Sequence, residues 1–294
     1  MAFTTRYIKH SMQALGALVF YWGFRLLPFS AASAIGGWVG RSIGPRLSVT
    51  KRAYRNITRA FPEKEEPEVQ EIISGMWDNL GRLAGEYPHL GQIDVYDPTG
   101  PVEVVGKEYA ELLRDDGKPG IFFSAHMGNW ELAPLSGSQL GLPVDRVYRA
   151  ANNRLVEWLY RQGRAAAKGS LIPKGPSGAR MLLKSLKGGQ HLGMLVDQKM
   201  NDGIPVPFFG RIAMTAPAIA ELALRFDCPV VPIHTERMDG ANFRIVLEEP
   251  LKIEVCGDRQ KDVAALMVQI NSKIEGWVRT HPEQWLWLHN RWSD

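Results

Sequence analysis

The chain has 294 residues, of which 45% are hydrophobic and 22% charged, and its net charge is +4. This composition supplies enough apolar side chains for a core and excludes an intrinsically disordered chain. The two cysteines, Cys228 and Cys256, exclude a disulfide framework and belong to no cluster with metal-ligand spacing, so we expect a reducing compartment and no bound metal.

Positive charge is concentrated at the N-terminal end. The first 60 residues contain nine of the 35 Lys and Arg residues and no acidic residue, the first of which is Glu63. Clustered basic residues beside an apolar segment favour an anionic membrane surface, at about 1 kcal/mol for each close Lys or Arg. Nucleic acid is the competing partner for a basic patch, but no nucleic-acid-binding motif accompanies this one, and we expect no nucleic acid to bind.

The apolar segment beside these charges covers residues 12–29. The stretch MQALGALVFYWGFRLLPF holds one charge, Arg25, in 18 residues. As a helix it would be about 27 Å long, slightly short of a hydrocarbon core of about 30 Å. Residues 1–30 are therefore predicted to be a membrane anchor, either a transmembrane helix or a helix lying in the membrane plane, and a buried core helix is the alternative. If the segment spans, the Lys/Arg excess after it places the rest of the chain in the cytoplasm.

Residues 31–95 predict a basic helical entry region. Residues 31–46 are rich in Gly, Ala and Ser, which suits close packing of helices. A basic amphipathic helix is expected over 51–61, and apolar residues at helical spacing predict another over 67–89. The turn-forming residues of 91–106 indicate a joint to the catalytic body.

Residues 96–294 predict a catalytic α/β domain. Strand and helix patterns alternate, which indicates a mixed, mostly parallel sheet flanked by helices. Expected strands are 120–125, 144–148, 191–196, 229–234 and 243–247, and expected helices are 155–167, 178–186, one that runs from an N-cap at Thr215 to Phe226, 263–278 and an aromatic helix at the end of the chain.

The block HMGNWE carries the strongest chemical signal. An apolar strand stops at Ala125, His126 comes next, Gly128 permits a tight turn, and a helix begins around Trp130. The turn can fold the carboxylate of Glu131 back to the imidazole, where a carboxylate on one ring nitrogen fixes the tautomer and raises basicity at the other. A general base for a hydroxyl group needs this arrangement. A buried histidine beside a helix-capping glutamate is the alternative.

With this block in place, the chain resembles the late acyltransferases of lipid A biosynthesis. These are the lauroyl/myristoyl acyltransferases of Gram-negative inner membranes, within the wider HX4D/E glycerolipid acyltransferase group. One block alone would be only suggestive, but several occur here in the same order and cover nearly the whole chain. They are HMGNWE at 126–131, VYRAANN at 147–153, Gly163-Arg164, VDQ at 196–198, PFFG at 207–210 with Thr215, and HPEQWLWLHNRW at 281–292.

The resemblance assigns roles to particular residues. It implies that His126 is the general base and Glu131 its orienting partner, and that Arg164 occupies the position of the family's essential arginine. A fixed guanidinium there would hold a phosphate or steady the thioester oxyanion. Asp197 is implied to be a further catalytic residue, and the segment that follows it does not reproduce an EF-hand loop. The expected substrate-binding residues are Arg149, Asn129, Gln198 and Thr215. Three tryptophans near the end of the chain predict either an interfacial face or internal packing, and they are Trp285, Trp287 and Trp292.

The resemblance also implies a reaction. The enzyme would move a fatty acyl chain from acyl carrier protein, a co-substrate and not a cofactor, to a hydroxyl of a hydroxyacyl chain on a Kdo-bearing lipid A precursor. Its partners would be acyl carrier protein, the lipid A precursor and membrane lipids, and its place the inner membrane, with the catalytic domain on the cytoplasmic side. Two alternatives stay open: the same transfer onto a lysophospholipid or another glycolipid, and a membrane lipid-binding protein without turnover.

Overall fold

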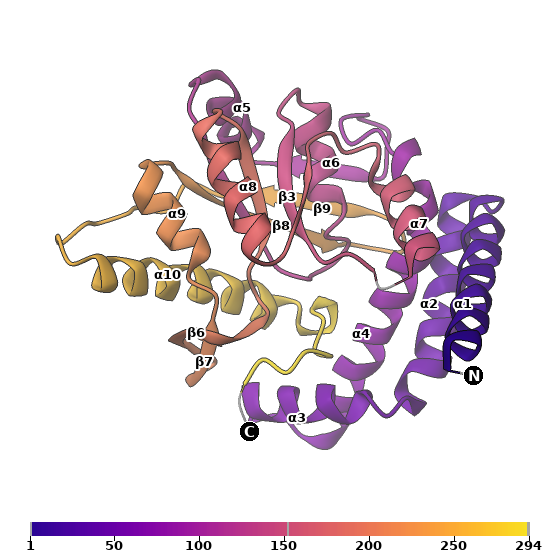
Figure 1. Cartoon of the computed structure of the whole chain (residues 1–294). Helices are drawn as coiled ribbons and strands as arrows, with labels where there is room; N and C mark the ends of the chain where they lie inside the picture. Colours follow the sequence, from indigo (N-terminus) through magenta and orange to yellow (C-terminus); the bar gives the residue numbers. More distant parts are fainter. Residues whose placement is uncertain (1, 152, 293–294) are drawn as a thin grey trace.

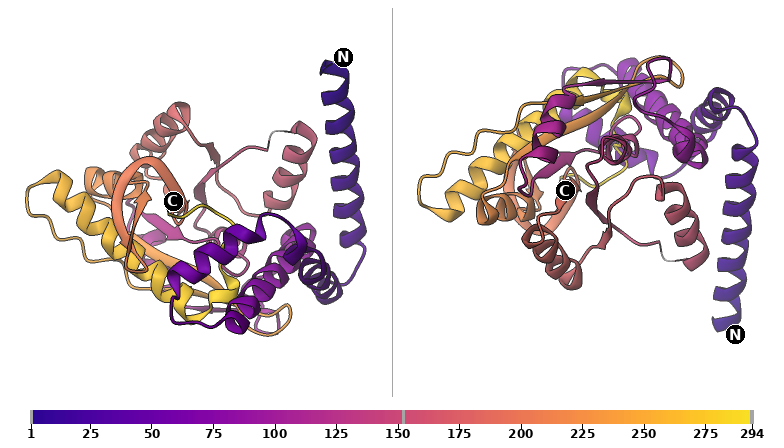
Figure 2. Two further views of the ribbon diagram at one scale, coloured as in Figure 1. Left: turned by 90° about the horizontal axis from the view of Figure 1, so that it is seen from below. Right: turned by 90° about the horizontal axis from the view of Figure 1, so that it is seen from above.

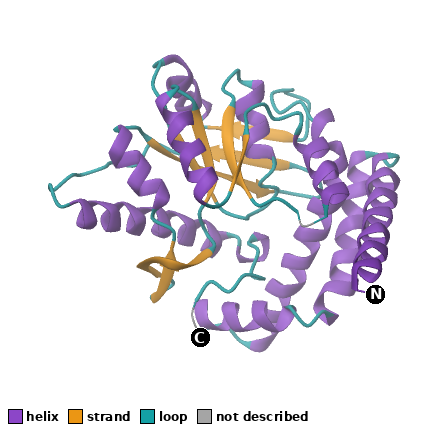
Figure 3. Ribbon diagram, in the orientation of Figure 1, coloured by secondary structure: helices purple, strands orange, loops and turns teal. Residues whose placement is uncertain are grey.

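The computed structural model describes residues 2–151 and 153–292, and a sheet lies at its centre (Figure 3). This sheet has seven strands. The strand order is β1-β9-β8-β2-β5-β3-β4, and only the β8–β9 pair is antiparallel, which confirms the predicted mixed, mostly parallel sheet. A separate antiparallel hairpin is formed by β6 and β7. The strands are β1 (Val102–Val105), β2 (Ile121–Ser124), β3 (Val144–Tyr148), β4 (Leu171–Pro173), β5 (His191–Leu195), β6 (Lys199–Phe208), β7 (Arg211–Thr215), β8 (Val230–Arg237) and β9 (Phe243–Leu247).

Helices surround this sheet and also form a separate N-terminal layer at one side of it (Figure 1). The N-terminal layer holds α1 (Ala2–Arg25), α2 (Phe29–Ile43), η1 (Gly44–Arg46), α3 (Thr50–Ala60), α4 (Glu66–Glu86) and η2 (Tyr87–Gln92). The helices of the α/β part are α5 (Lys107–Asp115), α6 (Leu132–Gln139), α7 (Arg154–Arg164), α8 (Pro176–Lys187), α9 (Ala218–Phe226), α10 (Arg259–Thr280) and η3 (Pro282–Gln284).

The central strand β2 is buried on both faces, and this explains its continuous apolar sequence. Side chains alternate along a strand, so Ile121 and Phe123 pack in the core on the side of α9 and α10. Phe122 points the other way, into the core formed with α5 and α6. The carboxyl end of β2 is therefore held between two packed layers, and this fixes the position at which the following loop begins.

Helices α2 and α4 approach closely through glycines. The small residues of 31–46 predicted close helix packing, and the structure shows that α4 is the partner. A Cβ atom at Gly81 would stand 2.2 Å from the carbonyl oxygen of Gly36, and one at Gly40 would stand 2.1 Å from that of Trp77. Contacts this short cannot exist, so the two backbones touch only because these positions lack side chains.

The predicted anchor over residues 12–29 is not one helix. Helix α1 ends at Arg25, and Pro28 precedes the first residue of α2, where its fixed φ and missing N–H suit a helix start. Across residues 2–151 and 153–292, no helix is both long enough and apolar enough to cross a membrane. Figure 2 shows α1 at the edge of the molecule, near α7.

The predicted aromatic helix at the end of the chain is also wrong. After η3 the segment is irregular, and Trp285, Trp287 and Trp292 are all buried, so these side chains pack internally. Backbone bonding explains the outcome: Met127 and Trp285 form an antiparallel bridge, and the N–H of Leu286 donates to the carbonyl oxygen of His126. Backbone groups of this segment therefore form hydrogen bonds with the loop after β2 in place of helical hydrogen bonds.

Further differences concern short elements. The sequence did not indicate β1, β4 or α5, or the β6–β7 hairpin, whose prolines are poor strand formers. Thr215 is the last residue of β7 and not the predicted N-cap, because Pro217 caps α9.

The glycine contact yields a test. We expect Gly81→Ala to lower the stability of the fold by about 1–3 kcal/mol, the usual cost of overpacking, because a methyl group there meets backbone and not a movable side chain. Gly276→Ala in α10 is the matched control, since nothing lies within 4 Å of its Cβ position, and it should gain up to about 1 kcal/mol. Denaturant unfolding followed by circular dichroism measures both. Equal stability of the Gly81 variant and the wild type would contradict the close contact.

Candidate active site

Strands β2 and β5 bring His126 and Asp197 together. The two strands pair in parallel with Ser124 beside Leu195, and each candidate residue lies two positions beyond that pair. The carboxyl ends of parallel neighbours meet at one edge of a sheet, where functional residues collect. Nδ1 of His126 consequently lies 2.8 Å from Oδ1 of Asp197, and the backbone N–H of His126 donates to Oδ2 over 3.0 Å.

Asp197 is a buried carboxylate with three donors. Besides the two from His126, the indole N–H of Trp285 donates to Oδ2 over 2.8 Å. Burial alone would raise the pKa of Asp197, but the hydrogen bonds from His126 and Trp285, together with the positive charge that the His126 ring has when it is protonated, outweigh burial and lower it. An ionised carboxylate at Nδ1 holds the ring proton there, so Nε2 of His126 carries the lone pair.

The loop after His126 is fixed from the opposite side. Gly128 has φ +56°, and a Cβ atom there would stand 2.1 Å from the carbonyl oxygen of Thr235, so this tight turn needs a glycine. Its N–H donates to the carbonyl oxygen of Gln284. The amide of Asn129 donates to Glu86, which forms a buried ion pair with Arg237.

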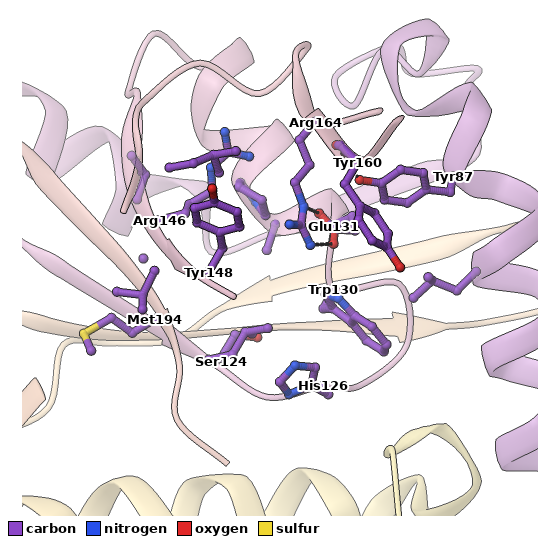
Figure 4. Close-up of a pocket in the computed structure, with 18 of the residues that line it drawn as sticks. Tyr87, Ser124, His126, Trp130, Glu131, Arg146, Tyr148, Tyr160, Arg164 and Met194 are labelled. Atoms are coloured by element: carbon purple, nitrogen blue, oxygen red, sulfur yellow. Dashed lines mark hydrogen bonds and ion pairs between the residues drawn. The ribbon is translucent and has the colours of Figure 1, made fainter. Parts of the chain in front are cut away.

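Glu131 does not contact His126 as predicted; it pairs with Arg164. Nε of Arg164 donates to Oε2 over 2.9 Å and Nη2 to Oε1 over 2.5 Å, as Figure 4 shows. The ring of Trp130 packs edge-on against His126 at 5.1 Å between centroids, and the next residue points toward α7 instead. Burial would lower the pKa of Arg164, but the hydrogen bonds and charge of Glu131 raise it. The orienting role predicted for Glu131 falls geometrically to Asp197.

A cavity of about 1150 Å³ adjoins both pairs. His126, Glu131 and Arg164 all line it, and much of the remaining wall is apolar or aromatic. That volume exceeds the roughly 300–1,000 Å³ typical of small-ligand pockets. Its charged lining among the described residues is one-sided, with one acidic residue, Glu131, against five basic ones, which are Arg146, Arg149, Arg164, Lys174 and Lys199.

The four predicted substrate-binding residues divide evenly. Arg149 and Gln198 line the cavity. Asn129 and Thr215 are 1% and 0% exposed and do not line it, so in this structure neither reaches a substrate there. Their polar groups serve the protein: Asn129 binds Glu86, and the Thr215 hydroxyl donates to the carbonyl oxygen of Ala213 and accepts from Arg291. The neighbouring Asn152 lies outside the described residues.

Two cavity residues escaped the sequence reasoning. Arg146 lies in the wall beside Tyr148, and burial lowers its pKa. A charged residue inside an otherwise apolar strand could have marked Arg146 as a candidate site residue. His289 lies 5.3 Å from His126 between ring centroids. It belongs to the quoted C-terminal block, but nothing local indicates that this block folds back onto the site.

Sequence comparison with known proteins identifies one family. The model of a family described as bacterial lipid A biosynthesis acyltransferase matches residues 3–294. A lipid A biosynthesis acyltransferase of Haemophilus influenzae is 22% identical, over 91% of this chain and 86% of that protein. The Escherichia coli lipid A biosynthesis lauroyltransferase is 24% identical over 83% and 78%, and the palmitoleoyltransferase 23% over 92% and 88%. A solved structure, the 1-acyl-sn-glycerophosphate acyltransferase of Thermotoga maritima, aligns over 97% of this chain and 100% of that one, with a TM-score of 0.40 and 10% identity.

The Asp197 environment generates the prediction for this site. In Asp197→Asn one side-chain oxygen becomes an NH2 group, which cannot accept the three donors that the carboxylate accepts. We expect turnover to fall at least about 10²-fold, since the His126 tautomer is no longer fixed. The stabilisation by this group is also lost as pH falls through the lowered pKa of Asp197, because protonation removes the same acceptor. Comparing acid unfolding of the wild type and Asp197→Asn measures this, and identical acid midpoints would contradict it.

Proposed function

This chain belongs to the bacterial lipid A biosynthesis acyltransferase family, and from that premise we propose the reaction, the base and the substrates. It is an acyltransferase of lipid A biosynthesis. We propose that the donor is a fatty acyl chain on acyl carrier protein, and that the acceptor is a hydroxyl of a hydroxyacyl chain on a Kdo-bearing lipid A precursor. We propose no cofactor.

The proposal depends above all on the position of Nε2 of His126. Asp197 binds the other ring nitrogen, and the ring lines a largely apolar cavity. In the proposed step Nε2 takes the proton of the acceptor hydroxyl while its oxygen attacks the thioester carbon. The tetrahedral intermediate then collapses, the C–S bond breaks, and the thiolate receives the proton from His126. The products are an ester and a free thiol.

Glu131 and Arg164 have a separate role in this proposal. The carboxylate accepts two of the five N–H groups of the guanidinium and fixes its plane at the cavity wall. The remaining N–H groups are available to a phosphate or to the thioester oxygen. The basic excess of the cavity lining favours phosphorylated substrates and an acidic carrier protein in the same way.

We propose that the protein lies on the inner membrane, on its cytoplasmic side, with α1 in the membrane plane. One face of this helix exposes apolar side chains at helical spacing, and Leu26 extends the stripe. An exposed stripe of this kind marks an interaction surface. The opposite face lines the cavity through Ala17, Phe20 and Tyr21, so an acyl chain would pass from lipid to the site along α1. The exposed residues are Met12, Leu15, Val19, Trp22 and Leu26.

Acyl transfer by purified protein tests the function. We expect wild type to acylate the Kdo-bearing precursor from acyl carrier protein, and His126→Ala to lose about 10²- to 10⁴-fold in kcat while keeping its circular dichroism spectrum. Mass spectrometry of the product identifies the ester. A lysophospholipid offered as competing acceptor is the second arm. Product formed only from that lipid, or undiminished turnover by His126→Ala, would overturn the acceptor or the base respectively.

Vesicle sedimentation tests the membrane proposal. We expect Val19→Gln and Trp22→Gln each to weaken binding to anionic vesicles by roughly tenfold, because burying a large apolar side chain is worth about 1.5–3 kcal/mol. Substitution is a cleaner change than deleting the helix, since α1 also walls the cavity. Val268→Gln on α10 is the control, as an exposed apolar residue outside the stripe. If all three variants bind as wild type does, α1 does not contact lipid.

A further inference from the structure

A second imidazole faces the proposed base across a side-chain amide. Nε2 of Gln198 lies 2.9 Å from Nε2 of His289 and 3.3 Å from Nε2 of His126. Oε1 of the same amide faces Nζ of Lys174 at 3.5 Å, so the amide nitrogen is directed toward the two rings. All three side chains line the cavity with His126. Gln198 therefore bridges the two rings.

The bridge specifies the state of both rings. An amide nitrogen only donates, so both Nε2 atoms must accept, and each ring must carry its proton on Nδ1. His126 meets this condition because Asp197 holds the proton on Nδ1. Burial, the largest cause, lowers the pKa of His289 to about 4, so its ring is neutral near pH 7. With one ring proton, His289 meets the condition when that proton is on Nδ1, which leaves Nε2 free to accept from Gln198.

His289 is also held in place through its backbone. The amide of Asn56 donates to the carbonyl oxygens of Trp287 and His289 over 2.8 and 2.5 Å, and Arg52 donates to that of Leu288. Both donors come from α3. Two residues earlier than Leu288, the N–H of Leu286 bonds to the carbonyl oxygen of His126 itself. The imidazole of His289 thus has a fixed position relative to the base.

We propose that Gln198 is an oxyanion donor of the reaction and that His289 is the positioning residue that holds its amide. In the free enzyme the shorter bond to His289 anchors Gln198, and the longer one to His126 is the one to be exchanged. When the acceptor hydroxyl binds to Nε2 of His126, that second N–H is released. It then donates to the carbonyl oxygen of the thioester, which becomes negative as the hydroxyl oxygen attacks. This inference rests on the acyl transfer proposed above.

Steady-state kinetics of four variants test the pair. Loss of one oxyanion donor typically costs about 10²–10³ in kcat, so we expect Gln198→Leu to lower kcat about 10²-fold with little change in KM. His289→Leu should lower it about tenfold. Because His289 acts through Gln198, the double variant should be no slower than Gln198→Leu. His289→Gln, whose side-chain oxygen accepts a hydrogen bond, should recover most of the activity.

His281→Leu is the control, as a histidine outside the cavity. Multiplying losses in the double variant, with a lowered Tm for His289→Leu, would make His289 a structural residue and overturn the proposal. Full kcat in Gln198→Leu would overturn it while leaving acyl transfer intact.

Nitrogen-15 NMR of the wild type separates this inference from the proposed function, because it needs no turnover. We expect His289 as the neutral Nδ1–H tautomer at pH 7. An Nε2–H tautomer would refute the bridge even in an active enzyme. Absence of acyl transfer by a wild type that shows the Nδ1–H tautomer would instead refute the reaction, and with it the oxyanion role.

Discussion

A buried ion pair between Glu86 and Arg237 connects the parts of this molecule. Two nitrogens of Arg237 donate to the two oxygens of Glu86 over 2.6 and 3.0 Å, and the side chain of Arg237 is 8% exposed and that of Glu86 0%. Glu86 ends α4, whereas Arg237 ends β8, so the pair joins the helical layer to the sheet. The carboxylate also accepts from Ser33 on α2 and from Asn129 beside the base. Removing one partner of such a pair costs about 3–5 kcal/mol, because the other charge stays buried and unpaired.

The Glu86–Arg237 pair and its partners also fix the positions of active-site groups. Asn129 connects the ion pair to the active site, because it donates to Glu86 and lies in the loop that joins β2 to α6. Two carboxylates each hold one basic group: Asp197 binds the imidazole of His126, and Glu131 binds the guanidinium of Arg164. Each acidic group therefore stabilises one basic group at the cavity, and the site keeps a positive excess that suits anionic substrates.

The C-terminal segment completes the site from outside the sheet. Trp285 donates to Asp197, and His289 accepts from Gln198. Helix α1 also contributes to the site from outside the sheet. Its inner face forms part of the cavity wall, and its outer face is an exposed apolar stripe. The C-terminal segment and α1 thus both contribute to a site built at the ends of β2 and β5. Substitutions in either should therefore change the rate of the reaction.

The sequence alone determined the features that depend on local pattern. Apolar runs and breakers located β2, β3, β5, β8 and β9, the small residues of 31–46 indicated close helix packing, and the order of motifs indicated the family. Tertiary structure decided which side chains meet. Glu131 is close to His126 in sequence, but packing of Trp130 against the ring turns it to Arg164. Asp197 and His289 reach His126 only through strand pairing and backbone bonding of distant segments. Periodicity specifies the faces of an element, whereas contacts between elements depend on sheet order and register, which no local pattern encodes.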